Sequence, residues 1–129
     1  MSKRYAEVVV LDELQVACPA GATTAIVGAS GSGKTTMLQL ANGVTQPDAG
    51  EVRVFGQLVP THEVEKFRRG IGYAVQGAGL FPHLSAKQNV TLLARLEGWT
   101  EEQIENRFLQ LLAEVDLPED VAERLPREL

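Results

Sequence analysis

A glycine-rich stretch that ends in a lysine and two threonines has the residue types and the spacing to bind phosphate. Gly28, Gly33, Lys34 and Thr35 satisfy the spacing G-x-x-x-x-G-K-S/T. Glycines let the backbone bend so that successive N–H groups point inward at phosphate oxygens. The lysine ammonium can reach the β- and γ-phosphates of a nucleotide, and the hydroxyl that follows can ligate Mg²⁺. The pattern therefore predicts a site for a nucleoside triphosphate, which we expect to be ATP with Mg²⁺.

The whole stretch 28–36 contributes to this predicted site. Thr35 is the expected Mg²⁺ ligand, and the Thr36 hydroxyl can bond a further phosphate oxygen. The positive end of the following helix dipole adds to the attraction for anions. The residues expected to contact the nucleotide from this stretch are Gly28, Ser30, Gly31, Ser32, Gly33, Lys34, Thr35 and Thr36.

A loop of this kind needs a strand before it and a helix after it. Residues 23–27 end in an apolar run that predicts a strand, and residues 34–41 carry the apolar spacing of a helix. Asn42 and Gly43, which tolerate a positive φ, predict the end of that helix. This context favours a phosphate loop over the alternative, a flexible turn of glycines and serines with an exposed lysine.

The remaining elements alternate in the first half of the chain and are helical in the second. Strands are predicted over 7–11, 51–55, 58–59 and 71–75, with a short polar helix over 63–69. Two capping boxes are predicted at helix starts, one from Ser85 with Gln88 and one from Thr100 with Gln103. A last short helix is predicted over 118–123. The alternation of strands and helices around the glycine loop predicts an α/β fold.

Composition and charge narrow the function classes. The chain has 129 residues, with 12 basic and 17 acidic side chains and a net charge of −5. This balance argues against non-specific nucleic-acid binding, because such binding relies on a basic surface. The single cysteine, Cys18, allows no internal disulfide and fits a reducing compartment. No apolar run approaches the roughly 18 residues that span a bilayer, so we expect a cytoplasmic protein that reaches a membrane only through a partner.

With the loop in place, the chain resembles the N-terminal half of an ATP-binding cassette (ABC) transporter ATPase subunit. Tyr5 lies 23 residues before Gly28, a spacing similar to that of the family's aromatic residue that stacks on adenine. Residues 72–76, followed by 80–85, resemble the family's glutamine loop. The resemblance implies that Gln76 contacts Mg²⁺ and orients the attacking water.

The resemblance also implies a P-loop NTPase fold that is incomplete. Residues 1–84 correspond to the N-terminal part of the ATP-binding core and residues 85–129 to part of the helical subdomain, with the C-terminal core strands missing. Leu129 matches the first residue of the family's signature motif, so no complete catalytic set is expected in the chain. We expect weak nucleotide binding without turnover, and self-association through unpaired strand edges.

Residues 76–83 and 96–99 resemble importers of quaternary amines such as glycine betaine, carnitine or choline. This implies the ATP-binding subunit of an importer, which couples ATP binding and hydrolysis to solute uptake at the inner face of the cell membrane. Its implied partners are transmembrane permease subunits and a second ATPase subunit.

Three alternatives remain open. They are another phosphoryl-transfer enzyme such as a small-molecule kinase or a GTPase, a non-transport nucleotide-binding module, and a soluble ABC ATPase of repair or translation. The matches at Tyr5 and Gln76, and the lack of an Asn-Lys-x-Asp guanine motif, argue against the first. The segment 80–85 favours a transporter over the last.

Overall fold

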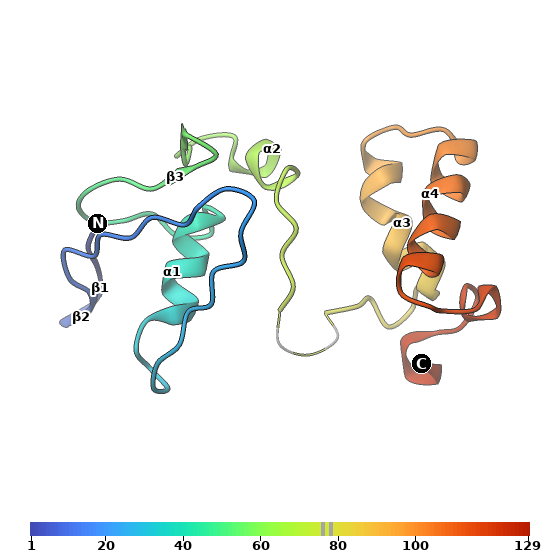
Figure 1. The fold of residues 1–129 in the computed structure, drawn as a ribbon, viewed down its shortest axis with the longest axis horizontal. Coiled ribbons are helices and arrows are strands. Elements are labelled where there is room, and N and C mark those ends of the chain that lie inside the picture. The colour runs from blue at the N-terminus through green and yellow to red at the C-terminus, as the bar shows by residue number, and fades with distance from the viewer. Residues whose placement is uncertain (76, 78) are drawn as a thin grey trace. The chain divides into compact units, whose positions relative to one another are not determined.

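The structure, a computed structural model, describes residues 1–75, 77 and 79–129 (Figure 1). The chain forms two compact units, Met1–Tyr73 and Ala74–Leu129, and each is described by itself. The division into parts 1–84 and 85–129 stays a prediction, since it rests on the subdomains of the resembled family and not on compactness. No helix in the described ranges is long and apolar enough to cross a membrane.

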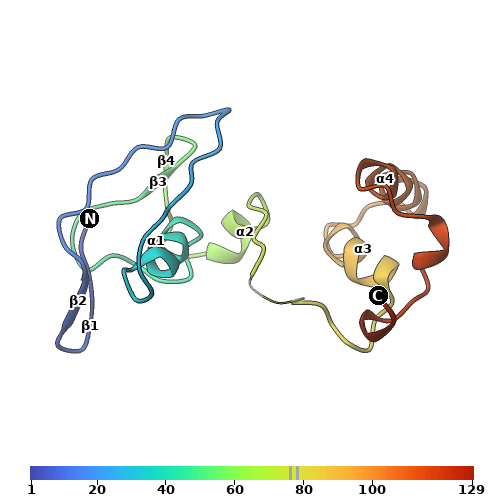
Figure 2. The same cartoon turned by 60° about the horizontal axis from the view of Figure 1, so that its bottom comes forward.

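The first unit contains two short antiparallel hairpins. β1 (Lys3–Tyr5) pairs with β2 (Val8–Leu11), and β3 (Arg53–Val54) pairs with β4 (Gln57–Leu58). Figure 2 shows the β1–β2 hairpin as a narrow two-stranded ribbon. Phe55 and Gly56 both have a positive φ, 50° and 78°, which is the backbone that a tight two-residue hairpin turn requires. The strands predicted at 7–11, 51–55 and 58–59 are therefore present in shortened or shifted form.

Two helices lie in the first unit, every residue of which the structure describes. α1 (Lys34–Ala41) has the predicted bounds. Asn42 is its C-cap residue, and the next residue, Gly43, has a φ of 71°. Leu40 on α1 has no exposed surface, so burial of its apolar face anchors this helix. α2 (Val64–Arg68) is slightly shorter than the predicted helix over 63–69.

Two predicted strands are not formed. Residues 23–27 and 71–75 have no ladder partner in the part of the chain that the structure describes. The side chains of Val27 and Val75 are 88% and 52% exposed. Apolar runs of this kind are typical of strands buried on both faces of a parallel sheet, but a strand forms only where a neighbour supplies hydrogen bonds. The prediction was wrong because the apolar pattern indicates only that these residues favour a strand and does not show whether a neighbouring strand is present.

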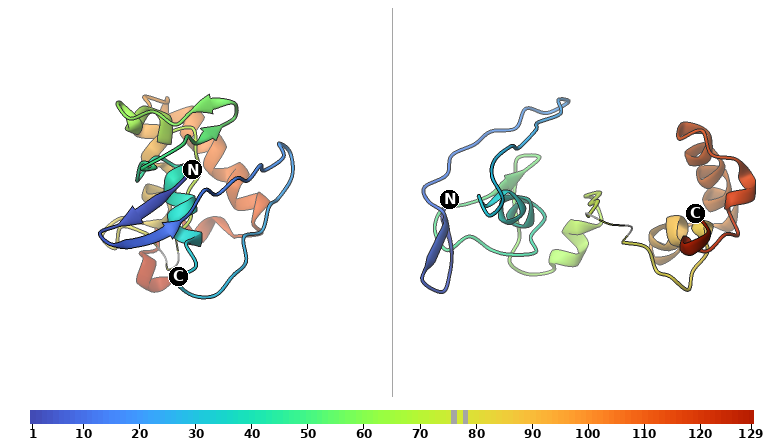
Figure 3. Two further views of the ribbon diagram at one scale, coloured as in Figure 1. Left: turned by 90° about the vertical axis from the view of Figure 1, so that its left-hand side faces the viewer. Right: turned by 90° about the horizontal axis from the view of Figure 1, so that it is seen from below.

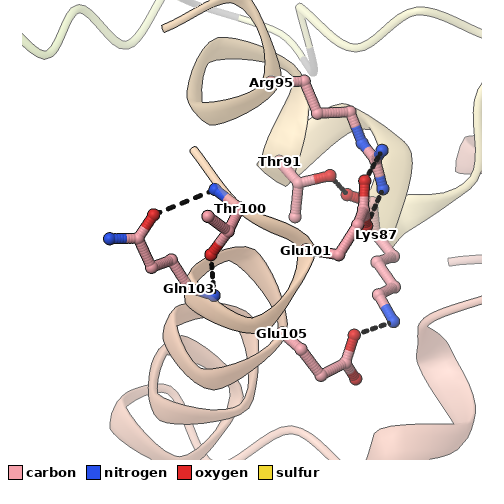
Figure 4. A network of polar contacts seen from close by, with 7 residues as sticks. All are labelled: Lys87, Thr91, Arg95, Thr100, Glu101, Gln103 and Glu105. Carbon is pink, nitrogen blue, oxygen red and sulfur yellow. Dashed lines mark hydrogen bonds and ion pairs between the residues drawn. The ribbon is translucent and has the colours of Figure 1, made fainter. Parts of the chain in front are cut away.

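The second unit is built on two helices, α3 (Ala86–Leu96) and α4 (Glu101–Glu114). Both predicted capping boxes are confirmed. The Ser85 hydroxyl accepts from the Gln88 backbone N–H at 3.3 Å, and the Gln88 side chain accepts from the Ser85 N–H at 2.9 Å. Thr100 and Gln103 form the same reciprocal pair at 3.2 and 2.9 Å (Figure 4). Each box satisfies two N–H groups that a helix start leaves open.

α3 and α4 lie side by side (Figures 1 and 3). Ile104 and Phe108 on α4 are buried, and Phe108 packs with Leu112 and Val121 in one apolar cluster. Val121 belongs to a short 3-10 helix, η1 (Glu119–Val121), which replaces the longer helix predicted over 118–123. A second 3-10 turn, η2 (Pro126–Glu128), follows.

Polar contacts also join α3 and α4 (Figure 4). The Arg95 guanidinium donates to both carboxylate oxygens of Glu101, at 2.6 and 3.2 Å. The Lys87 ammonium forms an ion pair with Glu105 and lies 5.5 Å from the centroid of the Phe108 ring. Because these charged side chains are partly exposed, they add little stability compared with the apolar cluster.

Candidate phosphate-binding site

The predicted loop leads directly into α1. Two glycines, Gly31 and Gly33, have φ values of 79° and 89°, a region that side chains with a Cβ rarely adopt. Gly33 is the N-cap of α1, and its carbonyl accepts from the Met37 N–H at 2.9 Å. These two positive φ values turn the chain sharply at the start of the helix, as a phosphate loop requires.

Close contacts surround the glycines at both ends of the loop, and at Gly33 a positive φ and a nearby backbone carbonyl favour glycine. A Cβ added at Gly28 would lie 2.7 Å from the Ser32 Oγ. A Cβ added at Gly33 would lie 2.8 Å from Leu11 Cδ2 and 3.1 Å from the Val10 carbonyl oxygen. Leu11 is buried at the end of β2, so this strand supports the last glycine of the loop and fixes where α1 begins.

Lys34 is the first residue of α1, and its side chain folds back across the loop. Its Nζ donates to the carbonyl oxygens of Gly28 and Ala29, at 2.9 and 2.7 Å, and lies 3.5 Å from the Ser32 Oγ. The ammonium charge is therefore held at the loop and does not extend into solvent. The role predicted for Lys34, contact with the β- and γ-phosphates, stays a prediction.

The start of α1 provides further donors. The N–H groups of Lys34, Thr35 and Thr36 lie in the first turn, where a helix supplies no intrahelical acceptor. No side chain caps this end, and the first turn, all of which is described, holds no acidic residue. The Thr35 side chain is exposed and that of Thr36 is half-buried. Open N–H groups, a lysine and a first turn without carboxylates favour an anion at this end.

These features fit a bound triphosphate. Gly31 has no atom within 4 Å of the place where a Cβ would stand, so the backbone at the middle of the loop is open to a ligand. Ser30 and Ser32 flank this glycine and are exposed. The structure thus brings together the eight predicted residues of 28–36 in one short turn and the first turn of a helix.

Two predicted site residues lie outside this group. Tyr5 is on β1, 45% exposed, and the Lys3 Nζ lies 5.3 Å from its ring centroid. It belongs to the hairpin that supports Gly33, since Tyr5 pairs with Val8 on β2. Gln76 lies outside the described residues.

Sequence reasoning missed the groups that hold α1 and β1 in place. Val10 and Leu11 support the start of α1, and Arg68 contacts its end, with Nε 3.1 Å from the Asn42 carbonyl oxygen. The place of Leu11 at the end of an apolar run was a sequence signal for its role. No sequence signal pairs Arg68 with Asn42, which lies 26 positions earlier.

The Asp48 carboxylate holds β1. It accepts from the Arg4 backbone N–H at 2.7 Å and from the Lys3 Nζ at 3.1 Å. These contacts, the Arg4 bond above all, hold the pKa of Asp48 below its ordinary value. Asp48 therefore stays ionised, and its bonds to β1 stay intact, at neutral pH.

Comparison with known proteins places this geometry in a family. The sequence profile of ABC transporters matches residues 11–129. The glycine betaine uptake system ATP-binding protein YehX of Escherichia coli (strain K12) is 34% identical over 129 residues, which are all of this chain and 42% of that protein. The Fe(3+) ions import ATP-binding protein FbpC of Yersinia pestis bv. Antiqua (strain Antiqua) is 37% identical over 131 aligned positions, which cover all of this chain and 37% of that protein.

A solved structure agrees. The dimeric post-hydrolysis state of the ATP-binding cassette MJ0796 bound to ADP and Pi matches with a TM-score of 0.83 and 29% identity, over 99% of this chain and 59% of that one. This confirms the α/β P-loop NTPase fold and its incomplete extent, since the chain spans less than half of either curated relative. Family membership implies nucleotide binding. Matched from residue 11 to its last residue, the chain belongs to the ABC transporter family.

Proposed function

We propose that residues 28–36 bind the phosphates of ATP with Mg²⁺ and that the chain is the N-terminal part of the ATP-binding subunit of an ABC importer. The observation that carries the proposal is the position of Lys34, whose ammonium lies against the Gly28 and Ala29 carbonyls at the uncapped start of α1. A cation and open N–H groups at one helix start make an anion site.

Each loop residue has a role in this proposal. Backbone N–H groups of Ser30, Gly31, Ser32 and Gly33 bond phosphate oxygens, for which the Ser32 N–H gives up its 3.3 Å contact with the Ala29 carbonyl. Lys34 exchanges a loop carbonyl for the β- and γ-phosphates. The Thr35 hydroxyl ligates Mg²⁺, and the Thr36 hydroxyl bonds a further phosphate oxygen. When bound, Mg²⁺ supplies charge neutralisation at the phosphates.

Two more residues complete the proposed site. Tyr5 stacks on the adenine ring, supported by its half-exposed side chain and by its spacing from the loop. Gln76 orients water and contacts Mg²⁺, a role that rests on the sequence resemblance.

The names of the relatives support the proposed partners and location. We place the intact subunit at the inner face of the cell membrane, bound to transmembrane permease subunits and to a second ATPase subunit. YehX and FbpC are import ATP-binding proteins by name, and the MJ0796 structure is dimeric. The exposed Val27 and Val75 support self-association of the chain by itself.

The proposed solute is a quaternary amine. The match to YehX, a glycine betaine uptake protein, across the full chain supports it, as do the stretches 76–83 and 96–99. FbpC, an Fe(3+) ions import ATP-binding protein, also matches across the full chain, so Fe(3+) is the competing solute. Uptake assays with the whole transporter, using labelled glycine betaine and Fe(3+), separate the two.

The chain by itself is proposed to bind nucleotide weakly and not to turn it over. Hydrolysis requires an aligned water and a group that accepts its proton. The first turn of α1 holds no carboxylate, and no acidic residue in the printed sequence follows a predicted strand at the position expected for that role. A phosphate-release assay on the purified chain should give no signal above that of Lys34→Ala.

Binding itself is tested with a fluorescent ATP analogue and Mg²⁺. Lys34→Ala should weaken the affinity by at least about tenfold, the effect of losing one charge-assisted contact. Lys66→Ala is the matched control, because Lys66 is an exposed lysine on α2, and it should leave the affinity unchanged. Equal affinities for wild type and Lys34→Ala would contradict the proposed site.

A further inference from the structure

The far end of α1 is held as closely as its start. Carbonyls in the last turn of α1 accept from the backbone N–H groups of Asn42, Gly43 and Val44. The two carbonyls just past the helix accept from a side chain of α2. Arg68 donates from Nε to the Asn42 carbonyl oxygen at 3.1 Å and from Nη2 to the Gly43 carbonyl oxygen at 2.8 Å. A guanidinium can bond two acceptors at once in a fixed geometry, and a cation suits the negative end of the helix dipole.

Close packing surrounds these two bonds. A Cβ at Gly43 would lie 2.7 Å from Val64 Cγ1 and 3.2 Å from Val59 Cγ1. Asn42 is 5% exposed, and its side chain accepts from the Val44 N–H at 3.0 Å. The end of α1 and the start of α2 are therefore closely packed, and a shift of one helix displaces the other.

α1 is a short rigid element between this contact and the phosphate loop. It has eight residues and is thus about 12 Å long, and Leu40 within it is fully buried. Lys34 lies at one end and the Arg68 acceptors lie at the other. Whatever fixes the orientation of α1 at the loop also fixes the carbonyls that Arg68 binds.

Arg68 is also the last residue of α2, and the chain leaves it toward 71–73. The Ile71 N–H donates to the Arg68 carbonyl oxygen at 2.9 Å. Residues 71–73 have no strand partner in the described ranges. The bond to the end of α2 helps to place them within the first unit, and Ile71 also lines a cavity with Phe55 and Leu58. A shift of Arg68 that moves its backbone therefore displaces the acceptor of the Ile71 N–H.

We infer that Arg68 is a positioning residue that couples the phosphate loop, through α1, to residues 71–73. Nucleotide that orders the loop also fixes the orientation of α1. The two bonds of the Arg68 guanidinium then restrict the end of α2, and residues 71–73 become less mobile as a result. This inference rests on the proposed nucleotide binding at 28–36.

Amide hydrogen exchange resolved by NMR tests the coupling in the full chain, with and without millimolar Mg²⁺ and ATP. In wild type, nucleotide should slow exchange at 28–36 and, by at least about threefold, at 71–73. In Arg68→Ala the slowing at 28–36 should persist and that at 71–73 should be lost. Lys66→Ala, which removes a cation from the same helix, should behave as wild type.

The outcomes separate the two proposals. No slowing at 28–36 in wild type would overturn the nucleotide site, and the coupling with it. Slowing at 28–36 but not at 71–73 in wild type, or equal slowing at 71–73 in Arg68→Ala, would overturn the coupling alone. If Arg68→Ala loses helical circular dichroism, Arg68→Lys decides: it keeps the charge but not the fork, so the slowing at 71–73 should fall, and full retention would overturn the inference.

Discussion

α3 and α4 form their backbone hydrogen bonds within the second unit. The extended segments 23–27 and 71–75, by contrast, pair with no strand among the described residues. The apolar side chains follow the same division. Phe108 on α4 is 3% exposed, and Val27 before the phosphate loop is 88% exposed. A helix forms its backbone hydrogen bonds within itself and needs only its apolar face to be covered, whereas a strand also needs a neighbouring strand to pair with.

The phosphate loop lies in the first unit, directly after the unpaired segment 23–27, yet its own geometry is well defined. Gly33 is packed against β2, and the end of α1 is held by Arg68. The loop therefore depends on a small local scaffold, and variants in the two units should separate binding from helical stability.

The largest effect is expected in the helical unit. Phe108→Ala removes a buried ring that packs on Leu112 and Val121, and it should destabilise α4 by about 3–5 kcal/mol. Hydrogen exchange of α4 amides measures this loss. Leu109→Ala, at a neighbouring residue that is 37% exposed, is the control and should cost far less. An equal loss of protection in α1 would contradict the independence of the two units.

A smaller effect is expected where the loop meets β2. Gly33→Ala combines a φ of 89° with a contact 2.8 Å from Leu11 Cδ2, so it should cost roughly 2 kcal/mol in α1 stability and weaken nucleotide binding. Gly21→Ala has a φ of 72° but open space around its Cβ, so binding should be retained. Thermal melting and nucleotide titration of both variants test this, and equal behaviour would refute the packing argument.

A cap variant should cost less again. Thr100→Ala removes the hydroxyl that accepts from the Gln103 N–H at 3.2 Å, and it should destabilise α4 by roughly 1 kcal/mol. Thr100→Ser, which retains the hydroxyl, is the matched control and should lie close to wild type. Exchange rates in the first turn of α4 give the measurement, and unchanged rates in Thr100→Ala would contradict the role of the capping box.

The smallest effect is a pH dependence at β1. The pKa of Asp48 is lowered chiefly by the Arg4 backbone N–H and also by Lys3, so its contribution to stability is complete above the ordinary value of 3.8 and is lost as pH falls through the lowered pKa. NMR signals of β1 should shift in that acidic range. Asp48→Asn should abolish this dependence, and an unchanged profile would contradict the assignment.

Local signals made the helices and the loop predictable. Ser85 and Thr100 each reveal a helix start through a partner three positions away, and the bounds of α1 follow from Lys34 and Asn42. The strands at 23–27 and 71–75 were mispredicted because pairing depends on neighbours that no local pattern reports. Arg68 was missed for a related reason: its contact with the carbonyls that follow α1 depends on the tertiary fold and not on spacing in the sequence.

The central claim is that nucleotide phosphates bind at the start of α1. Titration of the ¹⁵N-labelled chain with ATP and Mg²⁺, followed by backbone amide shifts, tests it most directly. The largest shifts should fall on Gly31 to Thr36, and Lys34→Ala should remove them while the signals of α3 and α4 stay in place. Shifts confined to other residues, or equal shifts in Lys34→Ala, would contradict the claim.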